Sequence, residues 1–347
     1  GGIVITKPGH ARGPIGSLLI REAGHPVPDQ DTFSATEEAL ALTDGLTAED
    51  TVLFLLSGGG SALFEAPLVP QEELQSITQS LLASGADIVE MNTIRKRLSA
   101  VKGGRFAQHC APARVFSIVL SDIIGDPLDM IASGPAYPDS STCADARRIA
   151  EQYGLRLSPE ASQCLERETP KVLDNVETLI TGSVRELCAA ASAACRELGY
   201  EPVLLTDSLD CEAREAGAFL AAVARAHQDT DCSLAFLAGG ETVVHLTGSG
   251  LGGRNQELAL SAAAGIAGLE DTAVFSLGSD GTDGPTDAAG GFVDGGTKER
   301  LARQGVRIFE VLKNNDAYHA LAACGGLLHM GATGTNVNDV AVLLIRR

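Results

Sequence analysis

The chain has 347 residues, of which 44% are apolar and 20% are charged, and its formal net charge at pH 7 is -19. This length suffices for two domains, because a single hydrophobic core rarely grows beyond roughly 250–300 residues. The negative charge argues against nucleic acid as a partner, since phosphate backbones need a broad basic surface, and no apolar run approaches the roughly 20 residues that span a membrane.

The first half of the chain alternates short apolar runs with helical stretches, which is typical of an α/β protein. Residues 51–60, TVLFLLSGGG, indicate a buried strand that ends in a glycine turn, and apolar side chains recur at helical spacing in residues 71–85. Residues 113–126 indicate a second buried strand, ending near Asp122. Residues 140–154 indicate a helix with serine and threonine capping candidates at its start.

Residues 163–175 are polar, contain a proline and break this pattern, so we place the domain boundary there, with domains at 1–170 and 171–347. Beyond the boundary the pattern of an α/β unit resumes. It predicts strands at 176–183, 201–208, 272–287 and 332–345, helices at 184–199 and 215–228 with a further pair after 288, and a hairpin at 232–248 that turns at Gly239 and Gly240.

The eight cysteines are isolated, with no C-x-x-C pair and no Cys/His cluster at zinc spacing. Such a set is typical of free thiols in a reducing compartment, so we expect a cytoplasmic protein. His10 and His25 also lack a partner at metal spacing, and we expect loop histidines bonded to the backbone. The opening GGIVITK reads as the middle of a strand, and we expect a preceding segment to be missing.

The glycine turn after residues 51–56 is the first candidate site. It comprises Ser57, Gly58, Gly59, Gly60 and Ser61. Glycines in such a turn allow backbone N–H groups to point at an anion, and serine hydroxyls add donors. The turn is neither a Walker A motif nor a nucleophile elbow. A tight turn without a ligand remains the alternative.

A basic run, RKRLSAVKGGR, occupies residues 95–105. A helix would place Asn92, Arg95 and Lys96 on one face, because they are spaced i, i+3 and i+4. That face suits multidentate binding of a phosphate or carboxylate. Lys102 lies beyond it, close to the Gly-Gly break. The alternative is a solvated helix face.

Carboxylates in glycine-rich turns follow two of the predicted strands. Asp122 and Asp126 follow one strand, and Asp280, Asp283 and Asp287 follow another. Mg²⁺ is held by one or two carboxylates together with substrate phosphates, and a carboxylate could instead accept a hydroxyl proton as general base. Residues that cap loops through Asx turns are the alternative.

Residues 248–253, GSGLGG, match the G-x-G-x-x-G fingerprint of dinucleotide binding. The fingerprint belongs on the first βα turn of a βαβ unit, whereas the preceding strand here is half of the predicted hairpin. Arg254 follows the last glycine, where a guanidinium suits an anion but is not needed by NAD. We therefore expect a phosphate-handling loop in preference to a dinucleotide turn.

Seven segments in order across nearly the whole chain carry a family resemblance. They are AGHPVPD (23–29), LLSGGGSAL (55–63), MNTIRKRLSAVKGGR (91–105), LSDIIGDPLDMIASGPAYPD (120–139), GGETVVHLTGSGLGGRNQELAL (239–260), GSDGTDGPTDAAGGFVDG (278–295) and TGTNVNDV (333–340). Together they resemble the glycerate 2-kinase family, whose C-terminal half is known as the MOFRL domain.

The resemblance implies an α/β fold with an N-terminal Rossmann-like domain, a C-terminal MOFRL-type domain and an active site in the cleft between them. It implies transfer of the γ-phosphoryl group of ATP to the 2-hydroxyl of D-glycerate, giving 2-phosphoglycerate, with ATP and Mg²⁺ required. Family members also have a lysine-containing, GAGK-like turn ahead of the first strand seen here. The oligomeric state stays open.

The resemblance also implies roles for individual residues. Arg254 would act at the reacting phosphoryl group or the glycerate carboxylate, and Asp280 and Lys102 are further catalytic candidates. The candidates for substrate or phosphate binding are Ser57, Gly58, Gly59, Gly60, Ser61, Asn92, Arg95, Lys96, Asn255, Thr335 and Asn336, and those for metal binding are Asp122 and Asp283. Two alternatives stay open: an NAD(P)-dependent hydroxypyruvate reductase, and a ligand-binding remnant without activity.

Overall fold

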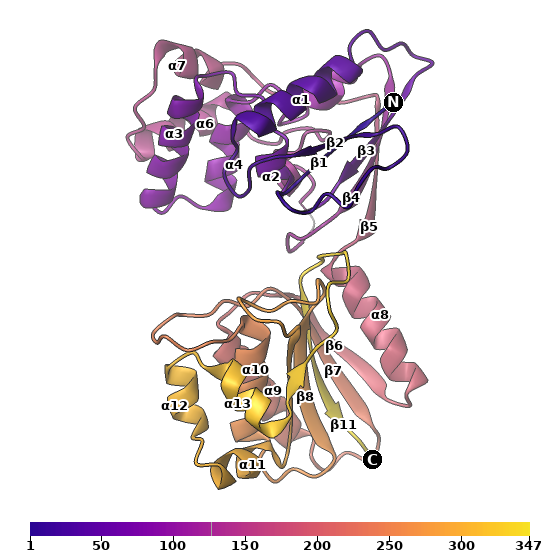
Figure 1. The fold of residues 1–347 in the computed structure, drawn as a ribbon, viewed down its shortest axis with the longest axis vertical. Helices are drawn as coiled ribbons and strands as arrows, with labels where there is room; N and C mark the ends of the chain where they lie inside the picture. The colour runs from indigo at the N-terminus through magenta and orange to yellow at the C-terminus, as the bar shows by residue number, and fades with distance from the viewer. Residues whose placement is uncertain (126) are drawn as a thin grey trace. The chain divides into compact units, whose positions relative to one another are not determined.

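The computed structural model describes residues 1–125 and 127–347 and shows two compact units. Unit 1 comprises Gly1–Leu120 and Asp126–Thr181, and unit 2 comprises Ser121–Gly125 and Gly182–Arg347. Both combine helices with β-sheets, as the α/β class predicts (Figure 1). The units divide later in the chain than the expected boundary at 170, because β5 (Val176–Gly182) joins a sheet of unit 1.

Unit 1 contains a two-stranded parallel sheet, β1-β2, and a three-stranded sheet in the order β3-β4-β5. Besides β5, its elements are β1 (Ile3–Thr6), β2 (Leu19–Glu22), α1 (Gln30–Leu42), β3 (Thr51–Leu56), α2 (Gly60–Leu63), α3 (Gln71–Ala83), α4 (Ile88–Arg97), α5 (Arg105–Cys110), β4 (Arg114–Leu120), the 3₁₀ turn η1 (Ile131–Ser133), α6 (Cys143–Gln152) and α7 (Pro159–Leu165).

Helices α3, α4, α6 and α7 share one apolar core. The helical spacing of Leu74, Ile77 and Leu81 places these side chains on one buried face of α3, as the sequence predicts. Thr142 caps α6, because its side chain accepts from the backbone N–H of Asp145. The predicted helices in this half are therefore confirmed.

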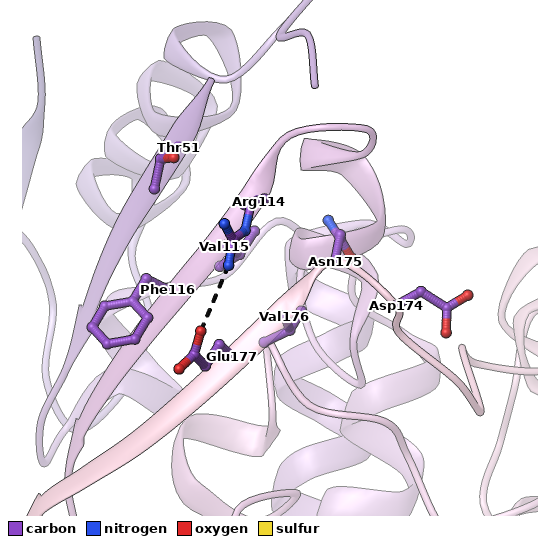
Figure 2. A pocket seen from close by; sticks show the side chains of 8 residues that line it. All are labelled: Thr51, Arg114, Val115, Phe116, Asp174, Asn175, Val176 and Glu177. Carbon is purple, nitrogen blue, oxygen red and sulfur yellow. Dashed lines mark ion pairs between the residues drawn. The ribbon is translucent and has the colours of Figure 1, made fainter. Parts of the chain in front are cut away.

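Strand β3 is confirmed, but the prediction that it is buried is wrong, because its residues alternate between exposed and partly exposed. Leu53 and Leu55 are 60% and 66% exposed, and Leu179 on β5 is 49% exposed. A hollow of about 510 Å³ opens beside the first residues of β3 and β4, crossed by the Arg114–Glu177 ion pair at 3.7 Å (Figure 2). It lies at the amino ends of these strands, so it is remote from the glycine turn at the carboxyl end of β3.

Unit 2 is built on a six-stranded mixed sheet in the order β10-β9-β8-β11-β7-β6. Only the β6–β7 pairing is parallel among the pairings of the described strands in this sheet. The elements are α8 (Val184–Glu197), β6 (Glu201–Leu209), α9 (Ala213–Ala226), β7 (Leu234–Gly240), α10 (Arg254–Gly265), β8 (Thr272–Gly278), β9 (Gly290–Asp294), α11 (Thr297–Arg303), α12 (Ile308–Lys313), α13 (Ala317–Cys324), β10 (Leu327–Leu328) and β11 (Asp339–Ile345).

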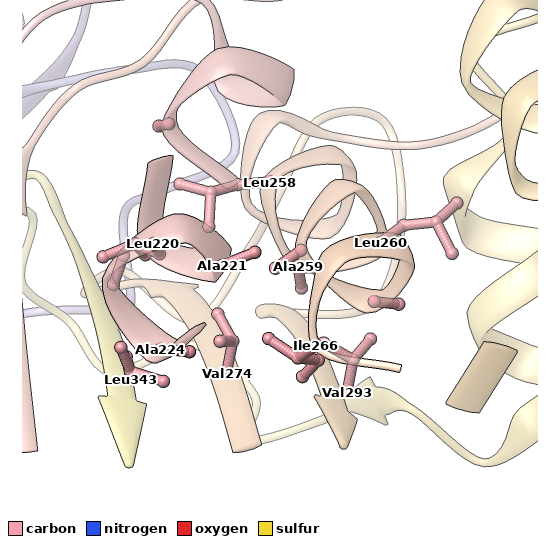
Figure 3. Packing of buried hydrophobic residues seen from close by; sticks show 14 of the residues in the cluster. Leu220, Ala221, Ala224, Leu258, Ala259, Leu260, Ile266, Val274, Val293 and Leu343 are labelled. Atoms are coloured by element: carbon pink, nitrogen blue, oxygen red, sulfur yellow. The ribbon is translucent and has the colours of Figure 1, made fainter. Parts of the chain in front are cut away.

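The larger core of unit 2 lies between the sheet and the pair of helices α9 and α10 (Figure 3), and a smaller one joins the sheet to α8. Leu220 of α9 and Leu258 of α10 are both buried in it, together with Val274 and Leu343 from the sheet. The two helices approach closely at Gly217, where an added Cβ would lie 2.2 Å from the carbonyl oxygen of Leu258. Ala-rich helices and a glycine at the crossing therefore set this packing.

The predicted hairpin at 232–248 is wrong. Its first strand is β7, but residues 241–248, the second half of the predicted hairpin, make only an isolated bridge between Glu212 and Val243. Strand β7 already pairs with β11 on one side and β6 on the other, so no edge remains for a hairpin partner. The β-branched run at Val243 is therefore outside the sheet although its composition favours a strand.

No helix of the described residues is long and apolar enough to cross a membrane. All eight cysteines are free thiols, as expected. Burial raises the pKa of Cys110 and of Cys188 to about 11, so neither thiol is activated as a nucleophile.

Candidate functional site

The loops of unit 2 that carry candidate site residues meet at one end of its sheet. Strand β7 ends at Gly240 and β8 ends at Gly278, and Asp339 at the start of β11 pairs with both because β11 is antiparallel to its two neighbours. Helix α10 begins close by, at Arg254, which contacts Asp339. The topology thus brings together the segments that contain Gly240, Arg254, Gly278 and Asp339, at the carboxyl ends of β7 and β8.

Arg254 is held by two carboxylates. Its Nε donates to Asp339 Oδ2 at 2.5 Å, its Nη2 donates to Asp339 Oδ1 at 3.1 Å, and its Nη1 donates to Glu241 Oε1. Burial lowers the pKa of Arg254, but the hydrogen bonds and charges of the two carboxylates outweigh it and raise the pKa above its ordinary value. The guanidinium is therefore fixed in place and permanently charged, and its side chain is 33% exposed.

Asn338 connects the Arg254 group to the loop at 121–125. Its Nδ2 donates to the backbone carbonyl of Asp122 at 2.9 Å and to Glu241 Oε2 at 3.2 Å. Asp122 is partly exposed and belongs to unit 2. The structure therefore brings Asp122, Glu241 and Asp339 to the same sheet end as Arg254, while Asp126 lies outside the described residues.

Asp283 caps helix α10. Its Oδ1 accepts from the backbone N–H of Asn255 at 3.1 Å and from Asn255 Nδ2 at 3.2 Å, and its Oδ2 accepts from the backbone N–H of Gln256 at 2.9 Å. The side chain is buried, and burial raises its pKa to about 6 even though these hydrogen bonds act in the opposite direction. Asp283 and Asn255 thus bind each other and the helix start, which leaves them no open face for a metal or a substrate.

The GSGLGG loop packs against the segment between α12 and α13. The Oδ1 of Asn315 accepts from the backbone N–H of Gly248 at 2.9 Å, and the Oδ1 of Asp316 accepts from that of Leu251 at 2.9 Å. An added Cβ on Gly250 would lie 2.5 Å from the Cβ of Asp316. These glycines serve close packing, and Asp283 occupies the start of α10. The loop therefore suits neither the dinucleotide turn nor the phosphate loop considered from the sequence.

The remaining candidates of unit 2 lie in two loops at this sheet end. Asp280 accepts from the backbone N–H and the hydroxyl of Thr282, both at 2.9 Å. These bonds form an Asx turn, the alternative to a metal or base role considered from the sequence. The hydroxyl of Thr333 donates to the carbonyl of Ser279 at 2.6 Å and ties this loop to the segment before β11. In that segment Thr335 is partly exposed and Asn336 is exposed.

In unit 1 the Ser57–Ser61 turn has open donors. Within the described parts of the chain, no acceptor engages the backbone N–H groups of Gly58, Gly59, Gly60 or Ser61. The hydroxyl of Ser61 lies 3.3 Å from that of Ser133, which in turn donates to Asn92 Oδ1 at 2.9 Å. Asn92 therefore reaches the turn through Ser133, but it is only 1% exposed, so the structure gives it no open face for the substrate contact expected from the sequence.

The basic run divides into buried and accessible cations. Lys102 is fully buried, and its Nζ donates to the carbonyls of Ser61 and Phe64 at 2.8 and 3.0 Å. Lys96 is also fully buried and pairs with Asp129 and Asp139 at 3.2 and 3.0 Å. This corrects the substrate-contact roles expected for both lysines, because both ammonium groups are buried and bind acceptors inside the protein.

Arg95 is the accessible cation among the three candidate cations of this run, Arg95, Lys96 and Lys102. It is partly exposed, and none of the described residues accepts a hydrogen bond from its guanidinium. Burial lowers the pKa of Arg95, and the charge of Glu65 partly offsets that effect. Its guanidinium is thus available to an anion.

Sequence reasoning missed several polar residues of these two groups. Glu241, Asn338 and Asp339 were not singled out as partners of Arg254, and Ser133 was not connected with the glycine turn. All four lie inside the seven family segments, three of them at strand ends and Ser133 in the turn η1. That position was the available signal. No group of three or more His, Cys, Asp or Glu residues in the described chain is arranged to hold a metal.

Comparison with known proteins gives consistent matches. The models named "Domain of unknown function (DUF4147)" and "MOFRL family" match residues 1–166 and 234–339. D-glycerate 2-kinase from Thermotoga maritima is 54% identical over 99% of this chain and 84% of its own length. A protein from Agrobacterium vitis, provisionally named a hydroxypyruvate reductase, is 40% identical over 99% of this chain and 81% of its own.

A solved structure agrees with these matches. The crystal structure of glycerate kinase from Thermotoga maritima superposes with a TM-score of 0.96 at 53% identity, over 99% of this chain and 84% of the other.

Proposed function

The chain belongs to the glycerate kinase family, and we propose from this premise that it is a D-glycerate 2-kinase. The 2-hydroxyl oxygen of D-glycerate attacks the γ-phosphorus of ATP, the bond from that phosphorus to the β,γ-bridging oxygen breaks, and ADP leaves. The hydroxyl proton passes to a base or to solvent, and the product is 2-phosphoglycerate. The observation that carries this proposal is the 54% identity to a D-glycerate 2-kinase across 99% of the chain.

Arg254 fits the electrostatic part of this reaction. Phosphoryl transfer depends mainly on positioning and on stabilising negative charge at the transferred group. A guanidinium has five N–H donors, and three of them contact Asp339 and Glu241. The two that remain can donate to a phosphoryl or carboxylate oxygen without any movement of the anchored side chain.

The carboxylates beside Arg254 suit a magnesium ion carried by the nucleotide. Glu241 and Asp339 outweigh the single positive charge of Arg254, so the group as a whole attracts a cation. Mg²⁺ needs only one or two protein carboxylates when phosphates supply other oxygens. Glu241 and Asp122 would hold it, since Asn338 binds the carboxylate of Glu241 and the backbone carbonyl of Asp122 and both residues are partly exposed. Bound there, the ion would neutralise phosphate charge.

Asp280 remains our candidate for the group that takes the hydroxyl proton. It is partly exposed at the same sheet end, next to the loop that carries Thr335 and Asn336. Those two residues have polar groups suited to the hydroxyls of glycerate or of the nucleotide. These roles follow from the family resemblance and from the position of the two loops.

The Ser57–Ser61 turn in unit 1 is proposed to bind an anionic group of one of the two substrates. Its open N–H groups, the hydroxyl of Ser61 and the guanidinium of Arg95 supply the donors. Lys96 and Lys102 support this region from the interior: Lys102 binds the carbonyl of Ser61 within α2, which begins in the turn, and that of Phe64 directly after it.

The reductase alternative lacks a place for its cofactor at GSGLGG. A dinucleotide needs the helix N-terminus for its pyrophosphate, and Asp283 already accepts from the first N–H groups of α10. Expelling that carboxylate would leave a buried acid without its donors. The kinase reaction makes no such demand on this loop.

A coupled assay tests the proposed reaction. The purified protein is supplied with ATP, Mg²⁺ and D-glycerate, and enolase reports 2-phosphoglycerate but not the 3-phosphate isomer. We expect enolase-dependent product and no oxidation of NADH when hydroxypyruvate replaces glycerate and ATP. Absence of 2-phosphoglycerate, or NADH oxidation by hydroxypyruvate, would overturn the proposal.

A further inference from the structure

Two residues outside the site described above, Lys7 and His25, lie against the glycine turn of unit 1. Lys7 follows β1 and His25 comes shortly after β2, and these strands are parallel, so both residues leave the small sheet at the same end. A Cβ built on Gly59 would lie 3.1 Å from Nε2 of His25 and 3.4 Å from Cε of Lys7. Both side chains therefore reach the turn at Gly59.

Glycine at position 59 keeps this approach possible. Its φ of 86° is in the left-handed region, which side chains other than glycine rarely adopt, and any side chain would also press on the His25 ring. The backbone N–H groups of the turn thus stay accessible beside the two side chains. The position at which Lys7 and His25 converge is the position at which the turn exposes its donors.

The charge of Lys7 is not compensated by a neighbour. Within residues 1–125 and 127–347 its ammonium group makes no ion pair or hydrogen bond, and neither does the His25 ring. Glu22, at the end of β2, accepts from the backbone N–H groups of Gly9 and Ala11 at 2.9 and 3.1 Å. An unpaired cation beside open N–H donors is an arrangement that attracts an anion.

The surroundings reinforce this local positive field. Arg95 is the second cation of this region, because its charge acts on Lys102, which binds the carbonyl of Ser61 in the turn and lies 3.6 Å from Glu65. Lys7 and Arg95, neither of which makes an ion pair within the described residues, thus supply positive charge in this region of a chain of net charge -19. Although His25 is exposed, desolvation and after it the charge of Lys7 lower its pKa, which favours the neutral ring with one N–H to donate.

On the basis of the kinase activity proposed above, we propose that Lys7 and His25 bind the anionic substrate group received by the Ser57–Ser61 turn. Lys7 supplies charge and His25 supplies a directed N–H. The ligand chemistry is a group of anionic oxygens, which the glycerate carboxylate and the phosphates of ATP both offer. Lys7 and His25 are binding residues in this proposal, and the chemical step does not pass through them.

The variants Lys7→Gln and His25→Ala test the assignment. A charge-assisted hydrogen bond contributes about 1.5–3 kcal/mol, so Lys7→Gln is expected to raise the KM of one substrate by about tenfold or more while kcat changes less than about threefold. Lys7→Arg should restore most of the loss. Isothermal titration with ADP and with D-glycerate, measured separately, identifies which of the two ligands depends on Lys7 and His25.

Lys298→Gln is the matched control, because Lys298 is an exposed lysine of α11 whose loss changes the net charge equally. It should leave both KM values unchanged. The proposal is overturned when Lys7→Gln and His25→Ala, both folded by circular dichroism, bind ADP and D-glycerate as tightly as the wild type. Titration measures binding without turnover. A wild type that binds these ligands but makes no 2-phosphoglycerate would refute the proposed activity, and the binding roles of Lys7 and His25 could still be tested.

Discussion

Among single residues, replacing Arg254 should have the largest effect on kcat. Arg254→Lys keeps the charge but cannot contact Asp339 through two nitrogens and Glu241 through a third at once. We expect kcat to fall by about 10²–10³, the range seen when one preorganised donor to a developing negative charge is lost. The KM values should change much less. Steady-state kinetics with the enolase-coupled assay measures both.

Arg300→Lys is the control for that experiment. Arg300 also pairs with a carboxylate in unit 2, Asp294 at 2.9 Å, but on helix α11 and half exposed. Its replacement should leave kcat within about twofold of the wild type, since an exposed pair contributes little. Equal losses in the two variants would show that Arg254 acts through the stability of unit 2 and not through the reaction.

The raised pKa of Asp283 should make the free energy of unfolding depend on pH. Its pKa is raised from 3.8 to about 6 in the folded protein, so the folded state holds a proton there that the unfolded chain releases. This contribution to stability is full below the unfolded pKa and is lost as pH rises through about 6. The free energy of unfolding should therefore fall by about 1 kcal/mol between pH 5 and pH 7 on account of Asp283 alone.

Urea unfolding at several pH values checks this expectation. Asp283→Asn removes the titration, so its stability should vary less between pH 5 and 7 than that of the wild type by about that 1 kcal/mol. Asp280→Asn, in the same loop, serves as the control for removing a carboxylate. If wild type and Asp283→Asn show parallel curves, Asp283 does not carry a raised pKa.

The partners of Arg254 show the limit of sequence reasoning at the residue scale. Arg254 itself was predictable, because a cation directly after a glycine run at a helix start is readable along the chain. Its anchors are 13 and 85 residues away. Asp339 reaches it only because β11 inserts between β7 and β8, and a strand order of this kind leaves no local trace in the sequence.

At the scale of secondary structure, the short helix α2 depends on Lys102. The Nζ of Lys102 binds the carbonyls of Ser61 and Phe64 and lies 3.6 Å from Glu65, all inside the protein. Lys102→Met would leave the carboxylate of Glu65 buried without its counter-ion, which costs about 3–5 kcal/mol. We expect the urea midpoint to fall accordingly, and Glu65→Met in the same chain to recover at least half of the loss.

The double variant distinguishes a structural lysine from a catalytic one. If Lys102 only supports α2, Lys102→Met/Glu65→Met should fold and retain a large part of kcat. Wild-type stability combined with lost turnover in Lys102→Met would contradict the structural role and restore Lys102 as a substrate contact.

Elements with complete local signals were predictable, and those defined by their neighbours were not. Helix α6 has a capping residue, a helical apolar repeat and a glycine after it, so its bounds could be read directly. Strand β9 reads GGFVD, which is short and begins with two glycines. It becomes a strand because β8 and β10 pair with it on both sides. Conversely, Val243 has strand composition but no free edge to join.

The same distinction explains the basic run at 95–105. Its helix was predictable from spacing, and α4 is present. The burial of Lys96 was not, because its partners Asp129 and Asp139 come 33 and 43 residues later. A cluster of cations in an acidic chain indicated ligand binding, whereas most of its members neutralise interior carboxylates.

At the scale of the whole molecule, the net charge of -19 predicts opposite effects of salt on stability and on substrate binding. Excess negative charge repels itself in the compact state, and salt screens that repulsion, since the Debye length falls from about 30 Å at 0.01 M to about 8 Å at 0.15 M. Raising sodium chloride across this range should increase the melting temperature, by about 2–4 °C per kcal/mol gained for a unit of roughly 150–250 residues. The KM of at least one anionic substrate should rise over the same range, because the positive groups at Lys7 and Arg95 are screened as well. Differential scanning fluorimetry and the coupled assay on the same samples measure both responses.

Chloride is used because sulfate stabilises proteins by exclusion from their surface. A melting temperature that falls with added chloride would show that ion pairs outweigh the general repulsion.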